Sequence, residues 1–185
     1  MKQINETGSS GLQAGEEVTQ MMVRVLFGGD NLSRKMLSSL FESSFHGLGL
    51  SMEFSDPPEH MHGRNDAADI LSVLLRRTGA HPSIWVVDGE IHLPGTGPVF
   101  GCAAGRCAVT TTCGLPGTAW MNVALHEIGH ILGLDHCTGH CLMQPALSRE
   151  EIERRPFALC EQCLGIARVN VQRGPSLKGY LRPVP

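Results

Sequence analysis

The sequence predicts one compact domain in which helices pack against a β-sheet. Short β-branched runs alternate with stretches of helical spacing along the first half of the 185-residue chain. Hydrophobic residues make up 42% of the chain and charged residues 18%. This composition supplies a core and carries too little charge for a disordered chain.

The first predicted elements follow a polar, Gly/Ser-rich tail over residues 1–17. Residues 18–27 are rich in Val and Met and stop at a Gly-Gly turn, which predicts a strand. Residues 31–45 place their apolar side chains at helical spacing and are predicted to form a helix. Residues 48–54 are expected to form a second strand, because the sequence Asp-Pro-Pro follows them.

The middle of the chain continues this alternation. Residues 65–77 carry four aliphatic side chains on one face, which predicts a helix. Residues 84–87 form a short apolar run typical of a buried strand. A glycine-rich segment follows, with strand candidates at 99–102 and 107–113. The order of strands and helices indicates an α/β sheet.

The last third begins with a helix predicted over 119–132 and ended by Gly133. Ser148 and Glu151 form a capping box that opens a partly broken helical region through residue 168. From Gly174 onward the chain is rich in Gly and Pro, so a loose end is expected.

Charge and hydropathy exclude several functions. The formal net charge is −3, which argues against nucleic-acid binding through bulk electrostatics. Residues 1–20 contain no apolar core of a secretory signal. Thr and Gly residues interrupt the longest uncharged stretch, so no membrane helix is expected. We expect a cytoplasmic protein, and its seven cysteines then indicate thiols or metal ligands rather than disulfides.

The segment that carries chemistry has the pattern HExxHxxGxxH. Four helical residues turn through roughly 400°, so His126 and His130 project from one face and can share one Zn²⁺. Gly133 lets the chain leave the helix, and His136 can return as a third ligand. Glu127 lies beside His126, where its carboxylate can take a proton from a water molecule activated by the metal.

Other residues leave alternatives open. Asp135 or His140 could replace His136 as the third ligand. Two short-spaced cysteine pairs can close on a second Zn²⁺, or the later pair could be a redox CxxC motif; the four cysteines are Cys137, Cys141, Cys160 and Cys163. His60 and His62 could form a minor metal site, although a solvated loop is the simpler interpretation. Cys102, Cys107 and Cys113 are expected to be buried thiols on strands.

The sequence resembles the metzincin metallopeptidases, and more narrowly the archaemetzincins. The resemblance rests on HEIGHILGLDHC, on the following Cys-Leu-Met that ends at Met143, and on the closing CxxC motif. Met143 lies seven residues after His136, as in a Met-turn. Two spacings, Cys137 to Cys141 and Met143 to Cys160, are each one residue shorter than in the archaemetzincin pattern.

The resemblance implies an α+β fold: a twisted mixed sheet with a backing helix and an active-site helix, and a small, irregular and helical C-terminal lobe. It divides the chain into residues 18–133 and 134–185. It implies a catalytic Zn²⁺ on His126, His130 and His136, and a structural Zn²⁺ on the four cysteines. Met143 would form the floor of the catalytic site, and an edge strand within 99–113 would hold an extended peptide.

The function so implied is a zinc-dependent peptidase with Glu127 as general base, or an aminopeptidase version of it. Its partner would be a peptide or protein substrate, and a monomer without nucleic-acid or membrane partners is expected. The competing hypothesis is a zinc-stabilised binding module with a silent cleft. Pro145 occupies the position where some metzincins carry a tyrosine, so Zn²⁺ would provide most of the oxyanion stabilisation.

Overall fold

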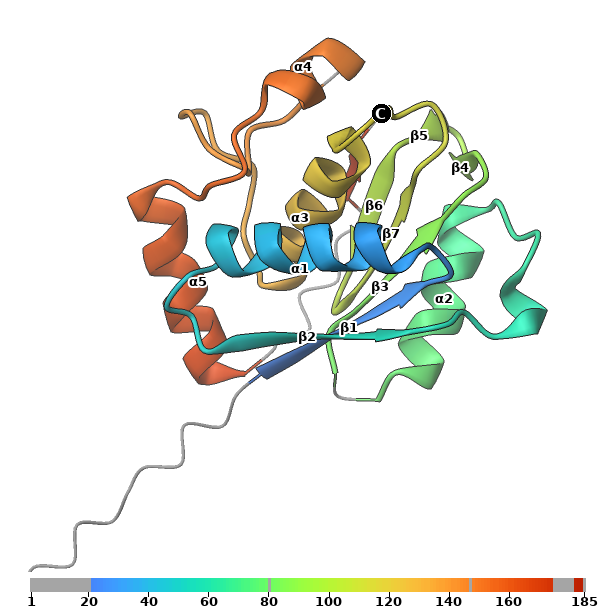
Figure 1. The fold of residues 1–185 in the computed structure, drawn as a ribbon, viewed down its shortest axis with the longest axis horizontal. Helices are drawn as coiled ribbons and strands as arrows, with labels where there is room; N and C mark the ends of the chain where they lie inside the picture. Colours follow the sequence, from blue (N-terminus) through green and yellow to red (C-terminus); the bar gives the residue numbers. More distant parts are fainter. Residues whose placement is uncertain (1–20, 80, 147, 175–181, 185) are drawn as a thin grey trace, which may run out of the picture.

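A computed structural model describes residues 21–174, except 80 and 147, together with 182–184. Six strands form one sheet in the order β2-β1-β3-β7-β6-β8 (Figure 1). Their bounds are β1 Met21–Phe27, β2 Leu50–Ser55, β3 Ser83–Val87, β6 Gly101–Ala104, β7 Cys107–Thr111 and β8 Arg182–Val184. The tail predicted over 1–17 lies outside the described residues.

The sheet is mixed, as predicted. Strands β2, β1, β3 and β7 are parallel, whereas β6 runs antiparallel to both of its neighbours. Strand β3 is buried throughout, with Ile84 and Val86 in the core on one face and Trp85 and Val87 in the core on the other. This two-sided burial explains why its sequence is continuously apolar rather than alternating.

Three long helices cover the two faces. Helices α1 (Asn31–Ser44) and α3 (Ala119–Ile131) pack on one face, and α2 (Ala67–Arg77) packs on the other (Figure 1). Every residue of α3 is buried. A helix that is apolar all round belongs inside a protein, so the sequence places the HExxH pattern in the core rather than on the surface.

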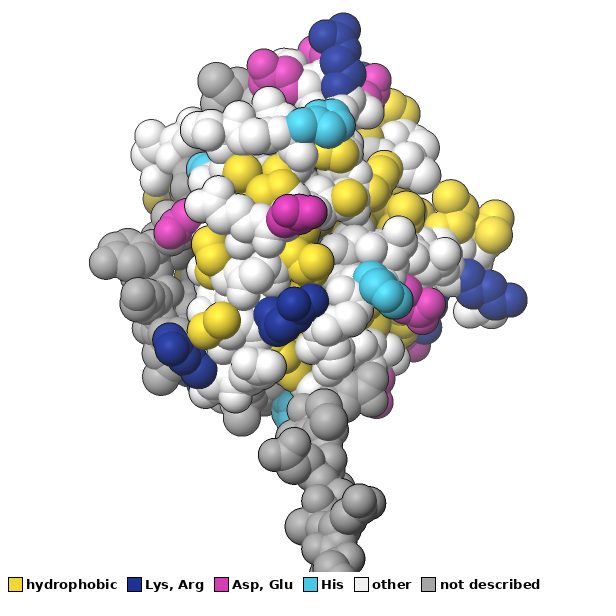
Figure 2. All heavy atoms as spheres, turned by 90° about the vertical axis from the view of Figure 1, so that its left-hand side faces the viewer, with side chains coloured by type: hydrophobic (Ala, Val, Ile, Leu, Met, Phe, Trp, Pro, Cys, Tyr) yellow, Lys and Arg dark blue, Asp and Glu magenta, His cyan; other side chains and the backbone are white. Residues whose placement is uncertain are grey.

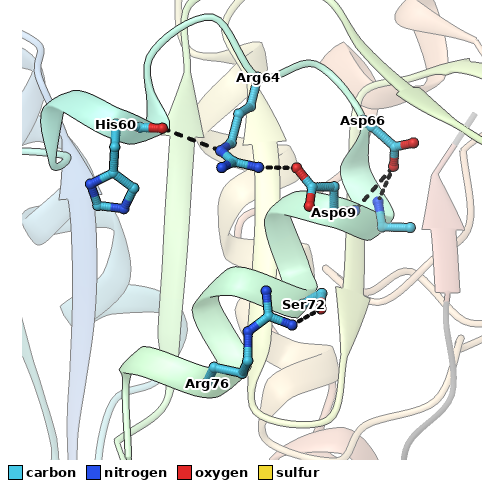
Figure 3. A network of polar contacts seen from close by, with 7 residues as sticks. His60, Arg64, Asp66, Asp69, Ser72 and Arg76 are labelled. Atoms are coloured by element: carbon cyan, nitrogen blue, oxygen red, sulfur yellow. Dashed lines mark hydrogen bonds and ion pairs between the residues drawn. The ribbon is translucent and has the colours of Figure 1, made fainter.

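A polar network fixes the start of α2 (Figure 3). The Asp66 carboxylate accepts hydrogen bonds from the backbone N–H groups of Ala68 at 2.8 Å and Asp69 at 3.1 Å, which caps the helix. Arg64 pairs with the Asp69 carboxylate and also donates to the carbonyl oxygen of His60. The short helix η1 (Glu59–Met61) precedes this network and a β4–β5 hairpin follows β3, with β4 at Ile91–Leu93 and β5 at Gly97–Val99.

The C-terminal helical region is divided in two. Helix α4 (Arg149–Arg154) begins at Ser148, whose hydroxyl accepts from the N–H of Glu151 as the capping box predicts. It ends before Arg155 because Pro156 follows, and the residue before a proline is driven out of helical geometry. Helix α5 (Glu161–Arg173) then extends to Arg173, beyond the predicted limit at 168.

The main difference from the sequence prediction lies near the end of the chain. Residues 182–184 were expected in a loose end, but they form β8, which pairs with β6. The predicted edge strand is therefore covered by another strand.

The face that carries α5 shows apolar side chains in small groups among polar and backbone atoms (Figure 2). Within the part of the chain that the structure describes, no helix has the length and apolar character needed to cross a bilayer.

Candidate active site

The three predicted histidines converge at the end of α3. The Nε2 atom of His130 lies 3.1 Å from Nε2 of His126 and 3.3 Å from Nε2 of His136. A tetrahedral Zn²⁺ with Zn–N bonds of about 2.05 Å holds its nitrogen ligands about 3.3 Å apart. The spacing of the three nitrogens therefore matches the ligand set of one zinc ion.

The main chain sets the tautomers of two of these rings. Nδ1 of His126 lies 2.8 Å from the carbonyl oxygen of Leu142, and Nδ1 of His130 lies 2.8 Å from that of Leu134. Because a carbonyl oxygen only accepts, both Nδ1 atoms carry the proton and both Nε2 lone pairs point inward. Burial also lowers the pKa of His126 well below its usual range, which favours the neutral form that binds metal.

His136 reaches the site because the chain turns sharply at Gly133. Gly133 has a φ of +80°, a conformation that residues with a Cβ rarely adopt. A Cβ at this position would also lie 2.8 Å from Nδ2 of Asn170 in α5. The Asn170 amide donates to the carbonyl oxygen of Leu132 at 2.9 Å, so α5 braces the turn.

Glu127 lies next to this triad on α3 and is fully buried. Neither of its carboxylate oxygens has a hydrogen-bond partner among the described residues. Burial raises its pKa well above the usual range, and the positive charge of Arg155 opposes this shift. A buried carboxylate without a hydrogen-bond partner among the described residues, one residue from a metal ligand, is suited to accept a proton.

Two neighbours of Glu127 were not anticipated from the sequence. Gly101 of β6 packs so closely that a Cβ added there would lie 2.7 Å from Oε1 of Glu127. Arg155 is buried, its guanidinium has no hydrogen-bond partner among the described residues, and burial lowers its pKa to about 10. Its carbonyl oxygen accepts from Nδ2 of Asn122 at 3.0 Å, which ties the segment after α4 to α3.

Met143 is fully buried under the helix that carries the triad. A Cβ added at Gly129 would lie 2.2 Å from its sulfur atom, so the glycine permits close packing of the loop against α3. The carbonyl oxygen of Met143 accepts from the N–H of Cys137 at 2.9 Å. This packing puts the Met143 sulfur against the helix that carries His126 and His130.

The four predicted cysteines form a second cluster, with sulfur atoms within 4.8 Å of one another. The sulfur atoms of Cys137 and Cys160 are 3.8 Å apart, and tetrahedral Zn–S bonds of about 2.3 Å give a separation of about 3.8 Å. The sulfur of Cys141 accepts from the N–H groups of Met143 and Cys160. A backbone N–H at Cys163 lowers the pKa of Cys160 to about 7, whereas burial raises that of Cys163.

The alternatives can now be compared with the geometry. Asp135 and His140 are absent from the metal-ligand clusters of the described residues, as are His60 and His62. Cys160 and Cys163 lie among four thiols, which favours zinc over an isolated redox pair. Cys102 and Cys107 are buried as expected, but Cys113 is exposed. Cys113 lies just after β7, beyond the strand that was expected to bury it.

Comparison with known proteins agrees with this geometry. The profile of Peptidase family M54 matches residues 120–168. The archaemetzincin of Aeropyrum pernix is 37% identical over 90 residues, which is 43% of this chain and 49% of the relative. Archaemetzincin-2 of Homo sapiens is 58% identical over 40 residues, 21% of this chain and 11% of the relative. Over this segment the chain is similar to the archaemetzincins.

Solved archaemetzincins share the fold. The structure from Methanopyrus kandleri superposes with a TM-score of 0.69 at 23% identity, covering 85% of this chain and 98% of that one. The structure from Archaeoglobus fulgidus gives 0.60 at 22% identity, with 79% and 98% covered. The predicted α+β archaemetzincin fold is thereby confirmed. The matched part of this chain spans at most about half the length of the curated archaeal archaemetzincins.

Proposed function

We propose that this chain is an archaemetzincin and a zinc-dependent peptidase that hydrolyses peptide bonds with Glu127 as general base. The supporting observation is the buried Glu127 carboxylate, without partners among the described residues, one residue from the metal triad. The matched family and relatives support the same reaction class.

Each residue has a distinct task in this mechanism. His126, His130 and His136 would hold Zn²⁺ through their Nε2 atoms. When bound, Zn²⁺ supplies a Lewis acid that lowers the pKa of water towards about 7 and polarises a carbonyl group. Glu127 accepts the proton of the attacking water and then delivers it to the leaving amine. The four cysteines would hold a structural Zn²⁺, which would fix the loop that carries His136.

Cleavage profiling of an unbiased peptide mixture by mass spectrometry tests this proposal. Wild type is compared with Glu127→Gln, which keeps the side-chain shape and removes the base. Glu42→Gln is the matched control, because Glu42 is an exposed residue of α1.

Cuts that disappear only in Glu127→Gln, with zinc content unchanged in all three proteins, would support the peptidase. The positions of the cuts decide between internal cleavage and the aminopeptidase version. Identical profiles in zinc-loaded wild type and Glu127→Gln would contradict the proposal and favour the binding module.

A further inference from the structure

The strand β8 lies directly beside the candidate active site. Its pairing with β6 is antiparallel, with Val184 opposite Gly101 and Arg182 opposite Ala103. Gly101 is the residue whose added Cβ would touch the Glu127 carboxylate. Neighbouring strands lie about 4.8 Å apart, so the backbone of Val184 is one strand spacing from the glycine that contacts Glu127.

An extended peptide would use the same edge. A sheet edge presents unpaired N–H and C=O groups, and peptides add to such edges as an extra strand. In this sheet the strand nearest to Glu127 on that side is β6, because its first residue packs against that side chain. A substrate strand on β6 would therefore have to occupy the place that β8 now holds.

We propose that segment 182–184 is an internal competitor, which covers the β6 edge until an extended peptide substrate displaces it. This inference rests on the proposed peptidase function, because it assigns β6 as the substrate edge. It also gives a register: the residue of a substrate that pairs with Gly101 lies nearest to the general base, and the substrate runs antiparallel to β6.

The sequence of the segment suits a weak competitor that resists cleavage. Only alternate residues of an antiparallel strand bond to a given neighbour, so a three-residue strand makes few hydrogen bonds to β6. The bonds from Arg182 to Pro183 and from Val184 to Pro185 are tertiary amides, which lack the N–H that an ordinary substrate bond carries. A three-residue strand can therefore be displaced by a longer peptide, which can form more hydrogen bonds along β6.

Releasing the segment is the first test, made in the full chain. A proline fits an antiparallel pair without loss only where the pair is not hydrogen-bonded, so Pro183 faces Cys102 in such a pair. The neighbouring pair of Gly101 with Val184 is then hydrogen-bonded, and Val184→Pro removes its donor. Val184→Ala keeps the N–H and is the matched control.

The expected effect follows from competition. A segment that covers the edge for nine-tenths of the time raises the apparent KM about tenfold. Val184→Pro should therefore lower KM by up to about tenfold with kcat unchanged, whereas Val184→Ala should leave both constants near wild type. Equal KM values in all three proteins would overturn the inference.

Locking the segment is the opposite test. Pro183→Cys places a second thiol opposite Cys102, and a pair without hydrogen bonds has Cα atoms about 4.5 Å apart, within the range of a disulfide. Mild oxidation should then abolish cleavage and reduction should restore it, with the linked peptide identified by mass and the zinc content unchanged. Wild type treated in the same way should keep its activity; full activity in the linked protein would overturn the inference.

A binding measurement separates this inference from the proposed function. A fluorescent, extended peptide is titrated into the Glu127→Gln protein, with and without Val184→Pro, and its polarisation is measured. Tighter binding with Val184→Pro supports the inference even when no variant cleaves any peptide. Cleavage by wild type with equal peptide affinities in both proteins would overturn the inference alone.

Discussion

Gly101→Ala tests whether the close approach of β6 sets the position of Glu127. The added Cβ would lie 2.7 Å from Oε1 and 2.9 Å from Cγ of Glu127, and 2.7 Å from a methyl carbon of Val123. Ordinary carbon contacts begin at 3.4 Å, so the carboxylate must retreat by about 0.7 Å. The surrounding core is packed, and no exposed side chain can give way in its place.

The size of the effect follows from this displacement. Misplacing a reacting group by about 1 Å costs on the order of 10²-fold in rate, so we expect kcat to fall about 10- to 100-fold. Overpacking of this kind lowers the free energy of unfolding by about 1–3 kcal/mol. The zinc content should stay at the wild-type value, because the added methyl group meets Glu127 and Val123 rather than the histidines.

The assay measures kcat on a quenched peptide, zinc by atomic emission, and unfolding in urea. Ala108→Gly is the matched control, because Ala108 is a buried residue of β7 in the same core and the change removes a methyl group instead of adding one. It should cost about 0.5–1 kcal/mol of stability with kcat unchanged. A folded, zinc-loaded Gly101→Ala protein with wild-type kcat would refute the reasoning.

Three further predictions concern the packing under the site, the cap of α2 and the cysteine cluster. Gly129→Ala should lower the free energy of unfolding by about 1–3 kcal/mol in urea, because its Cβ would lie 2.2 Å from the Met143 sulfur. A Cβ at Gly165 in α5 would meet open space, so Gly165→Ala should raise the free energy of unfolding by about 0.5–1 kcal/mol. Equal effects of Gly129→Ala and Gly165→Ala would contradict the packing argument. Asp66→Ala should cost about 1 kcal/mol in the same assay by removing the cap of α2, whereas Asp66→Asn should cost little; equal losses would show that the cap is not the cause. Cys160→Ser should weaken retention of the catalytic zinc against a chelator, because the cysteine cluster holds the residue next to His136; unchanged retention after loss of the structural zinc would disprove this link.

The sequence predicts the metal ligands well because their spacing is local. His126 and His130 are one helical turn apart, and Gly133 marks the turn that returns His136. The cysteine pairs are likewise short-range, so their clustering needs little knowledge of the fold. The α+β class follows from the family pattern, and the sheet it requires is visible in the apolar runs.

The contacts around Glu127, unlike the metal-ligand spacings, join segments that lie far apart in the sequence. Gly101 lies in a glycine-rich segment where nothing local distinguishes it, and its role arises only when β6 packs against α3. Arg155 carries the charge of a surface residue in sequence, and its burial results from the break that Pro156 imposes after α4. Residues 182–184 lack the alternating pattern that is typical of a strand. They form a strand because β6 offers a sheet edge with which they can pair.

The two carbonyl groups that orient the zinc-binding histidines belong to the main chain at Leu134 and Leu142. Side-chain substitution at either leucine leaves the acceptor atom in place, so these contacts are insensitive to mutation as long as the loop keeps its path. A graft of the HExxHxxGxxH segment onto another scaffold would carry the acceptor at Leu134 but lack the one at Leu142. Transferring the centre would require the loop of residues 134–143 and the cysteine cluster that shapes it.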